Sequence, residues 1–476
     1  MTSPLPIDAE ANLERLRRLV RQRSISEGDR GVRETAALLV QLHREVGFDV
    51  AEVADTDGLP GVWAYLDQGR AHTLVVYTMF DSGPLGDAWT RDPYGAEIGS
   101  AGRFERVLYG KGVRQKGPFM AFLAAIDALV RSGARLPVNV ACLLDGEEFL
   151  GSTHYHDVVE GYAERIPGPL GGINPTCNQG ATGAHALALA NKGCAYLDLR
   201  VSGGSWGKGP LGAQVHSSAQ AVVHSPAWRL VEALATLVDR EGGTHVAIDG
   251  FYDTEARPSA AARAALEHLA AGTDPSAWRS AAPGVAGFGE VGALVDDLSG
   301  ADLLERSLYG TTFNLSGLRS GYVGIDAPLF SLPGVATARL DIRYAPPEDG
   351  RRLVRLIREH LDRHGFPEVE IVDLGTHVGS VVPEEHTILD TAVTVARERG
   401  IETTLWPMRA AGAPVGVIGE VLGVPTLGGV GLGFGGSSAG ADEFYVVGDT
   451  GPVAGFASQA AYYATYLSRL RPDHAA

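Results

Sequence analysis

Residues Val75–Pro84 read VVYTMFDSGP, an apolar run that ends in a turn carrying Asp81. Its β-branched and aromatic residues favour a buried strand, and the glycine and proline that follow favour a turn. A second stretch, Val138–Ser152, reads VNVACLLDGEEFLGS and has the same form, an apolar strand followed directly by acidic residues. Ligands of α/β proteins bind beyond the carboxyl ends of parallel strands, so we expect the two acidic turns to form one site.

Helical segments alternate with these strands. Apolar residues recur at helical spacing over residues 9–46, and GPFMAFLAAIDALVRSG at 117–133 predicts a helix between the two strands. The alternation returns near the end of the chain, where residues 387–400 and 457–470 are helical in pattern and 425–434 are strand-like. We therefore predict an α/β fold with a mostly parallel sheet.

The middle of the chain follows another order. From about residue 190 the expected elements run strand, helix, strand, strand, helix and strand, which is the β-α-β-β-α-β order of a ferredoxin-like α+β domain. The expected strands are 194–203, 322–325, 335–344 and 369–375, and the helices are 225–238 and 350–365. We predict a catalytic domain in two parts, 1–189 and 376–476, with an inserted lid or dimerisation domain at 190–375.

Composition narrows the class of partner. The 476 residues are 45% hydrophobic and 20% charged, with a formal net charge of −17. An acidic protein repels nucleic acids and anionic membranes, so we expect a small-molecule ligand and neither of those partners. The N-terminal residues contain no apolar run of signal-peptide length, which favours a cytoplasmic protein. The three cysteines form no CxxC pair, and we expect buried thiols.

Two familiar motifs lack the context that their chemistry needs. GLGFGG at 431–436 matches a dinucleotide fingerprint, but no helix opens directly after it and no acid follows at the ribose spacing. GGSWG at 203–207 matches a nucleophile elbow, but it lies in a glycine-rich loop. Both are better explained as loops.

Six segments together resemble the metal-dependent peptidases and amidohydrolases of the M20 family, which are carboxypeptidase-like and carnosine-dipeptidase-like. The segments are TLVVYTMFDSGP, DAWTRDPYGAEI, LYGKGVRQKGP, LLDGEEFLGS, VHSSA and GADEF. The resemblance covers nearly the whole chain. It implies a zinc-peptidase α/β domain interrupted by a lid that usually mediates dimerisation, so a homodimer through the lid is possible.

The family's metal ligands are missing at every position that the resemblance identifies. Met79 stands for the first histidine, and GKGVRQKG places Arg114 and Gln115 where an aspartate bridges two metals. Phe149 follows the family's catalytic glutamate, NPTCNQG contains no acid, and Ala439 stands for the last histidine. Thioether and phenyl groups do not hold zinc. We therefore expect no cofactor and a metal-independent site, although substitution in an idle fold is an alternative.

Other residues of the family pattern are retained. Glu148 matches the general base, and Asp81 matches the acid that orients a metal-bound histidine. His216 matches a lid histidine that stabilises the oxyanion in the partner's site, so these three are the predicted catalytic residues. Arg343 matches an arginine that binds a substrate carboxylate, and His377 matches a further substrate-contacting histidine.

The expected substrate pocket also departs from the family. Phe330 replaces an asparagine or threonine, and Ala413 replaces a serine that helps to bind carboxylate. Arg409 can compensate as a substrate-binding residue, or can be simply exposed. We expect Arg114 to enter the former metal volume as a bidentate donor to Asp81 and Glu148, unless it points to solvent.

These features predict a metal-independent M20-like enzyme that acts on a small amino-acid-derived or peptide-like substrate. Amide hydrolysis by carboxylate acid/base catalysis is the first expectation, with Glu148 as the base after burial raises its pKa. One alternative is a non-hydrolytic acid/base reaction, namely cyclisation, epimerisation or elimination. Another is a binding protein without catalysis. A third is a metal enzyme with relocated ligands in STHYHD: His154, His156 and Asp157.

Overall fold

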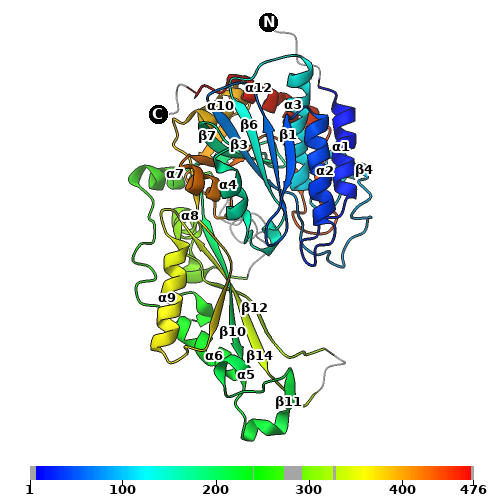
Figure 1. The fold of residues 1–476 in the computed structure, drawn as a ribbon. Helices are drawn as coiled ribbons and strands as arrows, with labels where there is room; N and C mark the ends of the chain where they lie inside the picture. The colour runs from blue at the N-terminus through cyan, green and yellow to red at the C-terminus, as the bar shows by residue number, and fades with distance from the viewer. Residues whose placement is uncertain (1–6, 240, 273–291, 325–328, 473–476) are drawn as a thin grey trace.

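The computed structural model describes residues 7–472 except 240, 273–291 and 325–328. Figure 1 shows a large domain built around a twisted sheet and a narrower domain that extends from it. The narrow domain is formed by the middle of the chain, and the first and last described helices belong to the large domain. The predicted α/β fold with an inserted α+β domain is confirmed.

The main sheet has six strands in the order β1-β2-β6-β3-β7-β18. Its strands β6, β3, β7 and β18 run parallel, whereas at one edge β2 pairs antiparallel with β6 and β1 pairs antiparallel with β2. The sheet is therefore mixed, with its parallel part where the acidic turns lie. The bounds are β1 Val50–Ala54, β2 Gly61–Leu66, β3 Thr73–Met79, β6 Asn139–Asp145, β7 Pro169–Pro175 and β18 Thr426–Val430.

Helices cover both faces of this sheet, which explains why β3 and β6 read as continuous apolar runs. One core joins the sheet to α1, α2, α3, α10 and α12, and a second core joins the other face to α4 and α11. The bounds are α1 Ala9–Arg21, α2 Val32–Glu45, α3 Val113–Arg131, α4 Tyr155–Ala163, α10 Thr387–Glu398, α11 Gly416–Leu422 and α12 Phe456–Arg469.

The inserted domain has a four-stranded antiparallel sheet in the order β12-β14-β10-β15, with α6 and α9 on one face. This order is the ferredoxin-like arrangement expected from the sequence. The prediction for its second strand is wrong: Tyr322–Gly324 is irregular, and Ile325 lies outside the described residues. The bounds are β10 Gly193–Ser202, α6 Pro226–Leu237, β12 Asn314–Ser320, β14 Val335–Tyr344, α9 Gly350–Arg363 and β15 Glu370–His377.

Smaller elements complete both domains. A four-stranded sheet in the order β19-β20-β5-β4 flanks the large domain, and short pairs join β8 to β17, β9 to β16 and β11 to β13. No helix among the described residues is long and apolar enough to cross a membrane. The bounds are β4 Ile98–Ala101, β5 Phe104–Tyr109, β8 His185–Ala188, β9 Ala190–Asn191, α5 Gly203–Trp206, β11 Gln214–His216, α7 Ala260–Ala271, α8 Gly300–Tyr309, β13 Ser331–Pro333, β16 Ser380–Val381, β17 Thr403–Trp406, β19 Gly435–Gly436 and β20 Phe444–Val446.

Candidate functional site

Three carboxyl groups gather at the carboxyl ends of β3 and β6. Asp145 is the last residue of β6, Glu148 begins the 3₁₀ turn Glu148–Leu150, and Asp81 follows β3. Asp145 and Glu148 are each near enough to Asp81 to raise the pKa of its carboxyl group, although burial is the larger cause. The structure therefore brings the two acidic turns close together, as the strand order predicts.

Asp81 is almost completely buried, and its Oδ2 accepts a hydrogen bond of 3.0 Å from the backbone N–H of Phe149. Its Oδ1 is buried and has no hydrogen-bond partner among the described residues. Burial raises the pKa of Asp81 well above its ordinary value, and the nearby carboxyl groups of Asp145 and Glu148 act in the same direction. Asp81 thus holds the backbone beside Glu148.

Asp145 is a member of this group that the sequence analysis did not select. Burial raises the pKa of its carboxyl group to about 7, against hydrogen bonds from Ser152 Oγ at 2.6 Å and from the Glu147 N–H at 3.0 Å. Tyr77 lies close by, and its buried hydroxyl has no partner among the described residues. Asp145 and Tyr77 both belong to strands, where the sequence analysis looked for core residues rather than for site residues.

Glu148 lies on the wall of a cleft of about 780 Å³ between the two domains. The cleft also contains Phe149 from the large domain and Tyr196 and Asp341 from the inserted domain. Burial raises the pKa of Glu148 to about 7, and the positive charge of Arg343 opposes this rise. A carboxyl group with this pKa is able to accept and to return a proton near neutral pH.

Arg343 does not present a free guanidinium to the cleft. Its Nε donates to Asp341 Oδ1 at 2.7 Å, and its Nη2 donates to the hydroxyl of Tyr196 at 2.5 Å. The guanidinium also lies over the Tyr196 ring, 5.0 Å from the centroid. The predicted carboxylate anchor is therefore already paired with an acid of its own strand.

His377 is buried at the joint between the domains. Its Nε2 donates to the carbonyl oxygen of Gly151 at 2.7 Å, and this carbonyl follows directly on the Glu148–Leu150 turn. The backbones of Gly151 and Gly375 also touch, because a Cβ atom on Gly375 would lie 1.9 Å from Gly151 O. The structure thus places His377 beneath the Glu148–Leu150 turn, whereas the sequence predicted a contact with substrate.

Arg114 was expected to contact Asp81 and Glu148, but the structure places it beside Glu443. Its backbone N–H donates to Glu443 Oε1 at 3.0 Å, and its charge helps to lower the pKa of Glu443 against the effect of burial. In the described part of the chain its side chain makes no hydrogen bond or ion pair with Asp81 or Glu148. The buried cation beside Asp81 is Lys116, whose pKa burial lowers to about 8.

Arg409 lies at the end of β7, where its Nη2 donates to Asn178 Oδ1 at 3.2 Å. Burial lowers the pKa of this arginine. It forms no ion pair with any described residue, so its charge is available to a ligand. The suggestion that it is simply exposed is not met, since the side chain is largely enclosed.

His216 and Phe330 lie together but far along the inserted domain. Their rings stack with centroids 5.2 Å apart, and both side chains are exposed. Figure 1 shows β11, which ends at His216, at the end of the inserted domain away from the large domain. The fold of one chain does not bring either residue to Glu148.

The alternative metal cluster does not form. His154 Nδ1 lies 3.0 Å from Glu147 Oε1, whereas His156 faces Glu160 at 3.5 Å, so the two imidazoles have different partners. Within the described ranges no group of three or more His, Cys, Asp or Glu residues could hold a metal ion.

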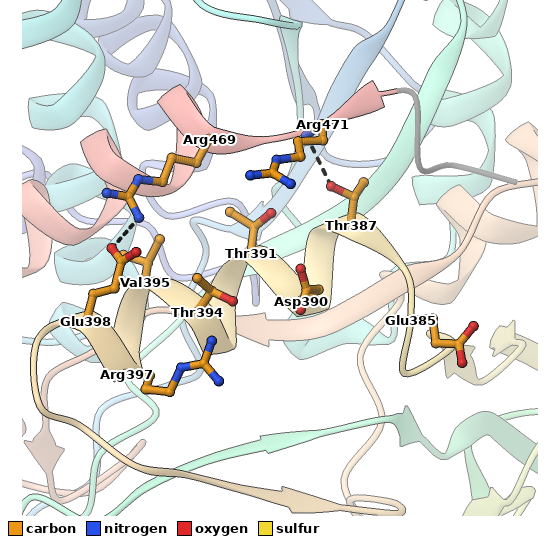
Figure 2. Close-up of a pocket in the computed structure, with 10 residues that line it drawn as sticks. All are labelled: Glu385, Thr387, Asp390, Thr391, Thr394, Val395, Arg397, Glu398, Arg469 and Arg471. Atoms are coloured by element: carbon orange, nitrogen blue, oxygen red, sulfur yellow. Dashed lines mark hydrogen bonds and ion pairs between the residues drawn. The ribbon is translucent and has the colours of Figure 1, made fainter.

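A second hollow lies on α10 and the end of α12 (Figure 2). Its wall includes an ion pair between Arg469 and Glu398 and a hydrogen bond of 3.2 Å from the Arg471 N–H to Thr387 Oγ1. The residues that line it include no buried carboxyl group with a raised pKa. The cleft at Glu148 is therefore the better candidate.

Solved structures with the same fold identify the architecture. An M20 family metallo-carboxypeptidase from Sulfolobus solfataricus superposes with a TM-score of 0.80 and 25% identity, covering 97% of this chain and 99% of that one. The chain has the M20 peptidase fold. Human carnosine dipeptidase 1 also shares the fold, with a TM-score of 0.74 and 18% identity over 97% of each chain. Residues 209–369 match the family described as a peptidase dimerisation domain.

Sequence comparison finds M20-type dipeptidases. The Cys-Gly metallodipeptidase of Schizosaccharomyces pombe is 26% identical over 339 residues, which are 67% of this chain and 63% of that protein. Human β-Ala-His dipeptidase is 27% identical over 187 residues, 38% of this chain and 34% of that protein. The chain thus aligns with less than two thirds of the length of the fission yeast relative.

These relatives correct two predictions. We expected a metal-independent enzyme without a cofactor, but the Cys-Gly dipeptidases of two yeasts are metallodipeptidases, so the expectation is wrong. That expectation took the loss of individual ligand residues as evidence about the reaction of the whole chain. The donor set still does not fit the family's metal pair, because Met79, Gln115, Phe149 and Ala439 offer no carboxylate or imidazole.

Proposed function

We propose that this chain is a hydrolase of small peptide-like amides, and that Glu148 exchanges protons with the substrate in the cleft between the two domains. The observation that supports this most directly is the position of Glu148 on the cleft wall, with burial raising its pKa to about 7. The kinship with M20 peptidases favours hydrolysis over the other acid/base reactions.

The residues around Glu148 have separate tasks in this proposal. The Glu148 carboxylate takes a proton from the attacking water, and the resulting acid returns it to the leaving amine. Asp81 fixes the backbone of Phe149 through its 3.0 Å hydrogen bond, which holds the catalytic turn. Arg343 lowers the pKa of Glu148 and so keeps part of it ionised.

The lid completes the site in a dimer. The dimerisation-domain match supports a homodimer, and the edge strand β12 carries the exposed apolar side chains Leu315 and Leu318. An exposed edge strand with apolar residues is suited to pairing with a second chain. In such a dimer the exposed rings of His216 and Phe330 would enter the partner's cleft, where His216 donates to the developing oxyanion.

The test is hydrolysis of a dipeptide panel, followed by mass spectrometry of the released amino acids. Because the relatives are metallodipeptidases, each reaction is run with added Zn²⁺ or Mn²⁺ and also with a chelator. We expect turnover by the wild type and a loss of about 100-fold or more in Glu148→Gln. The exposed Glu105→Gln is the matched control and should keep the wild-type rate. Equal rates for Glu148→Gln and the wild type would exclude Glu148 as the base.

A further inference from the structure

Two large apolar side chains are exposed directly beside Glu148. Phe149 and Leu150 complete the 3₁₀ turn that Glu148 begins, and their exposed fractions are 38% and 42%. Both residues line the cleft of about 780 Å³ between the two domains. Single apolar residues on a surface are ordinary, but here a pair of them adjoins the proposed base inside a concave site. Such a pair is suited to contact an apolar part of a ligand.

Phe149 has a fixed place on the cleft wall. Its backbone N–H donates to Asp81 Oδ2 at 3.0 Å. Its ring packs against the turn after β3, where a Cβ atom on Gly83 would lie 2.9 Å from Phe149 Cδ1. A ring that is held in this way loses little further freedom when a ligand packs against it, so the entropic cost of binding is low.

Two residues of the inserted domain lie against the end of this turn. Tyr196 and Leu374 also line the cleft, and both are close to Gly151, the residue after Leu150. A Cβ atom on Gly151 would lie 2.5 Å from Leu374 O and 3.3 Å from Tyr196 Cδ2. Leu59 lines the same cleft from the loop before β2. The apolar part of the wall therefore has contributions from both domains.

The ionisable side chains of the described wall are paired within the protein, with the exception of Glu148. The pairs are Asp29–Arg33 at 2.8 Å, Glu147–His154 at 3.0 Å, Asp198–Arg339 at 2.7 Å and Asp341–Arg343 at 2.7 Å. A charged side chain of a ligand therefore meets no unpaired opposite charge on this wall apart from Glu148, which the reaction uses. The surface that remains for a ligand side chain is the apolar one.

We propose that Phe149 and Leu150, together with Tyr196 and Leu374, form an apolar subsite, so that the chain selects peptide-like substrates with an uncharged apolar side chain beside the bond that is cleaved. This inference rests on the proposed function and names its substrate class. The occupant is an aliphatic or aromatic side chain, because covering the exposed parts of Phe149 and Leu150 removes apolar surface from water. A polar side chain of the same shape gains less, since its own polar atoms lose water.

Calorimetric binding to the Glu148→Gln protein tests the subsite without consuming the ligand, with and without added Zn²⁺. Gly-Leu is compared with Gly-Asn, and Leu-Gly with Asn-Gly, because leucine and asparagine have nearly the same shape and differ in polarity. We expect at least one leucine dipeptide to bind about tenfold or more tightly than its asparagine counterpart. Equal binding within both pairs, or no binding in either, would overturn the subsite.

Variants in the same background assign the preference to the turn. Phe149→Ala and Leu150→Ala should each remove most of it, and Phe149→Leu, which keeps an apolar side chain, should retain most of it. The matched control is Ile98→Ala, which removes an apolar side chain of similar exposure, 41%, on β4 and should leave the preference unchanged. A leucine preference that survives both alanine substitutions would overturn the assignment.

A second copy of this chain is the other possible occupant of the apolar wall. If its lid covers Phe149 and Leu150, the alanine variants would weaken dimerisation in sedimentation equilibrium and leave the leucine preference unchanged, which would overturn the subsite. Selective binding of leucine dipeptides without hydrolysis by the wild type would refute the proposed function but not the subsite. Hydrolysis of dipeptides without this selectivity would refute the subsite alone.

Discussion

A heterodimer with Glu148→Gln in one subunit and His216→Ala in the other tests whether the lid acts on a partner's cleft. His216 lies at the end of the inserted domain that points away from its own large domain (Figure 1). In a closed two-fold dimer each cleft would receive Glu148 from one chain and His216 from the other. One cleft of this heterodimer then has both native side chains, and the other cleft has neither.

The expected rate is about half that of the wild-type dimer, because one of two equivalent clefts is intact. Each homodimeric variant should lose about 100-fold or more, since the base or the oxyanion donor is missing from both clefts. The two chains are co-expressed with different tags, the heterodimer is purified through both tags, and initial rates on a dipeptide are measured. The control heterodimer has both substitutions in one chain, which damages both clefts. Equal rates for the two heterodimers would refute the exchange of His216 between subunits.

The remaining predictions concern the catalytic turn. The kcat/KM of the wild type should rise with pH through about 7, because only ionised Glu148 accepts a proton, and a profile that falls across this range would contradict its role as base. His377→Ala should lower kcat about tenfold with little change in KM, while His377→Gln, which keeps an N–H donor for Gly151 O, should recover part of the loss. Gly375→Ala should lower the melting temperature more than Gly365→Ala, because both glycines have positive φ but only Gly375 faces a backbone atom, Gly151 O, within 4 Å of a new Cβ.

Hydrophobic patterning predicted most of the fold. The alternation of apolar strands and helices placed β3 and β6 at the centre of the sheet, and the order of elements in the insert predicted its ferredoxin-like topology. The second strand of the insert was misplaced, because Tyr322–Gly324 has the β-branched and aromatic residues of a strand whereas β12 reads NLSGLRS. The backbone of β12 is fixed by its pairing with β14, which local preference does not show.

The site was predictable where it follows directly from a strand end, and less so elsewhere. Glu148 and Asp81 belong to turns that apolar strands position, so the sequence indicated both. Asp145 was overlooked, although its place two residues before Glu147 was a usable signal. The partners of His377 and Arg409 lie 226 and 231 residues away in the chain, and such contacts depend on the tertiary fold.

The position of Arg343 relates the inserted domain to the chemistry of the large one. Its charge lowers the pKa of Glu148, and it does so from β14 across the boundary between the domains. Removal of this charge alone, with the burial of Glu148 unchanged, would raise the pKa of Glu148 and lower its ionised fraction at neutral pH. Asp341 lies on the same strand as Arg343 and is paired with it. The size of the effect on the pKa of Glu148 therefore depends on the distance between Arg343 and Glu148. Part of the Glu148 carboxyl group is therefore kept ionised, against the larger effect of burial, by a charge that belongs to the other domain.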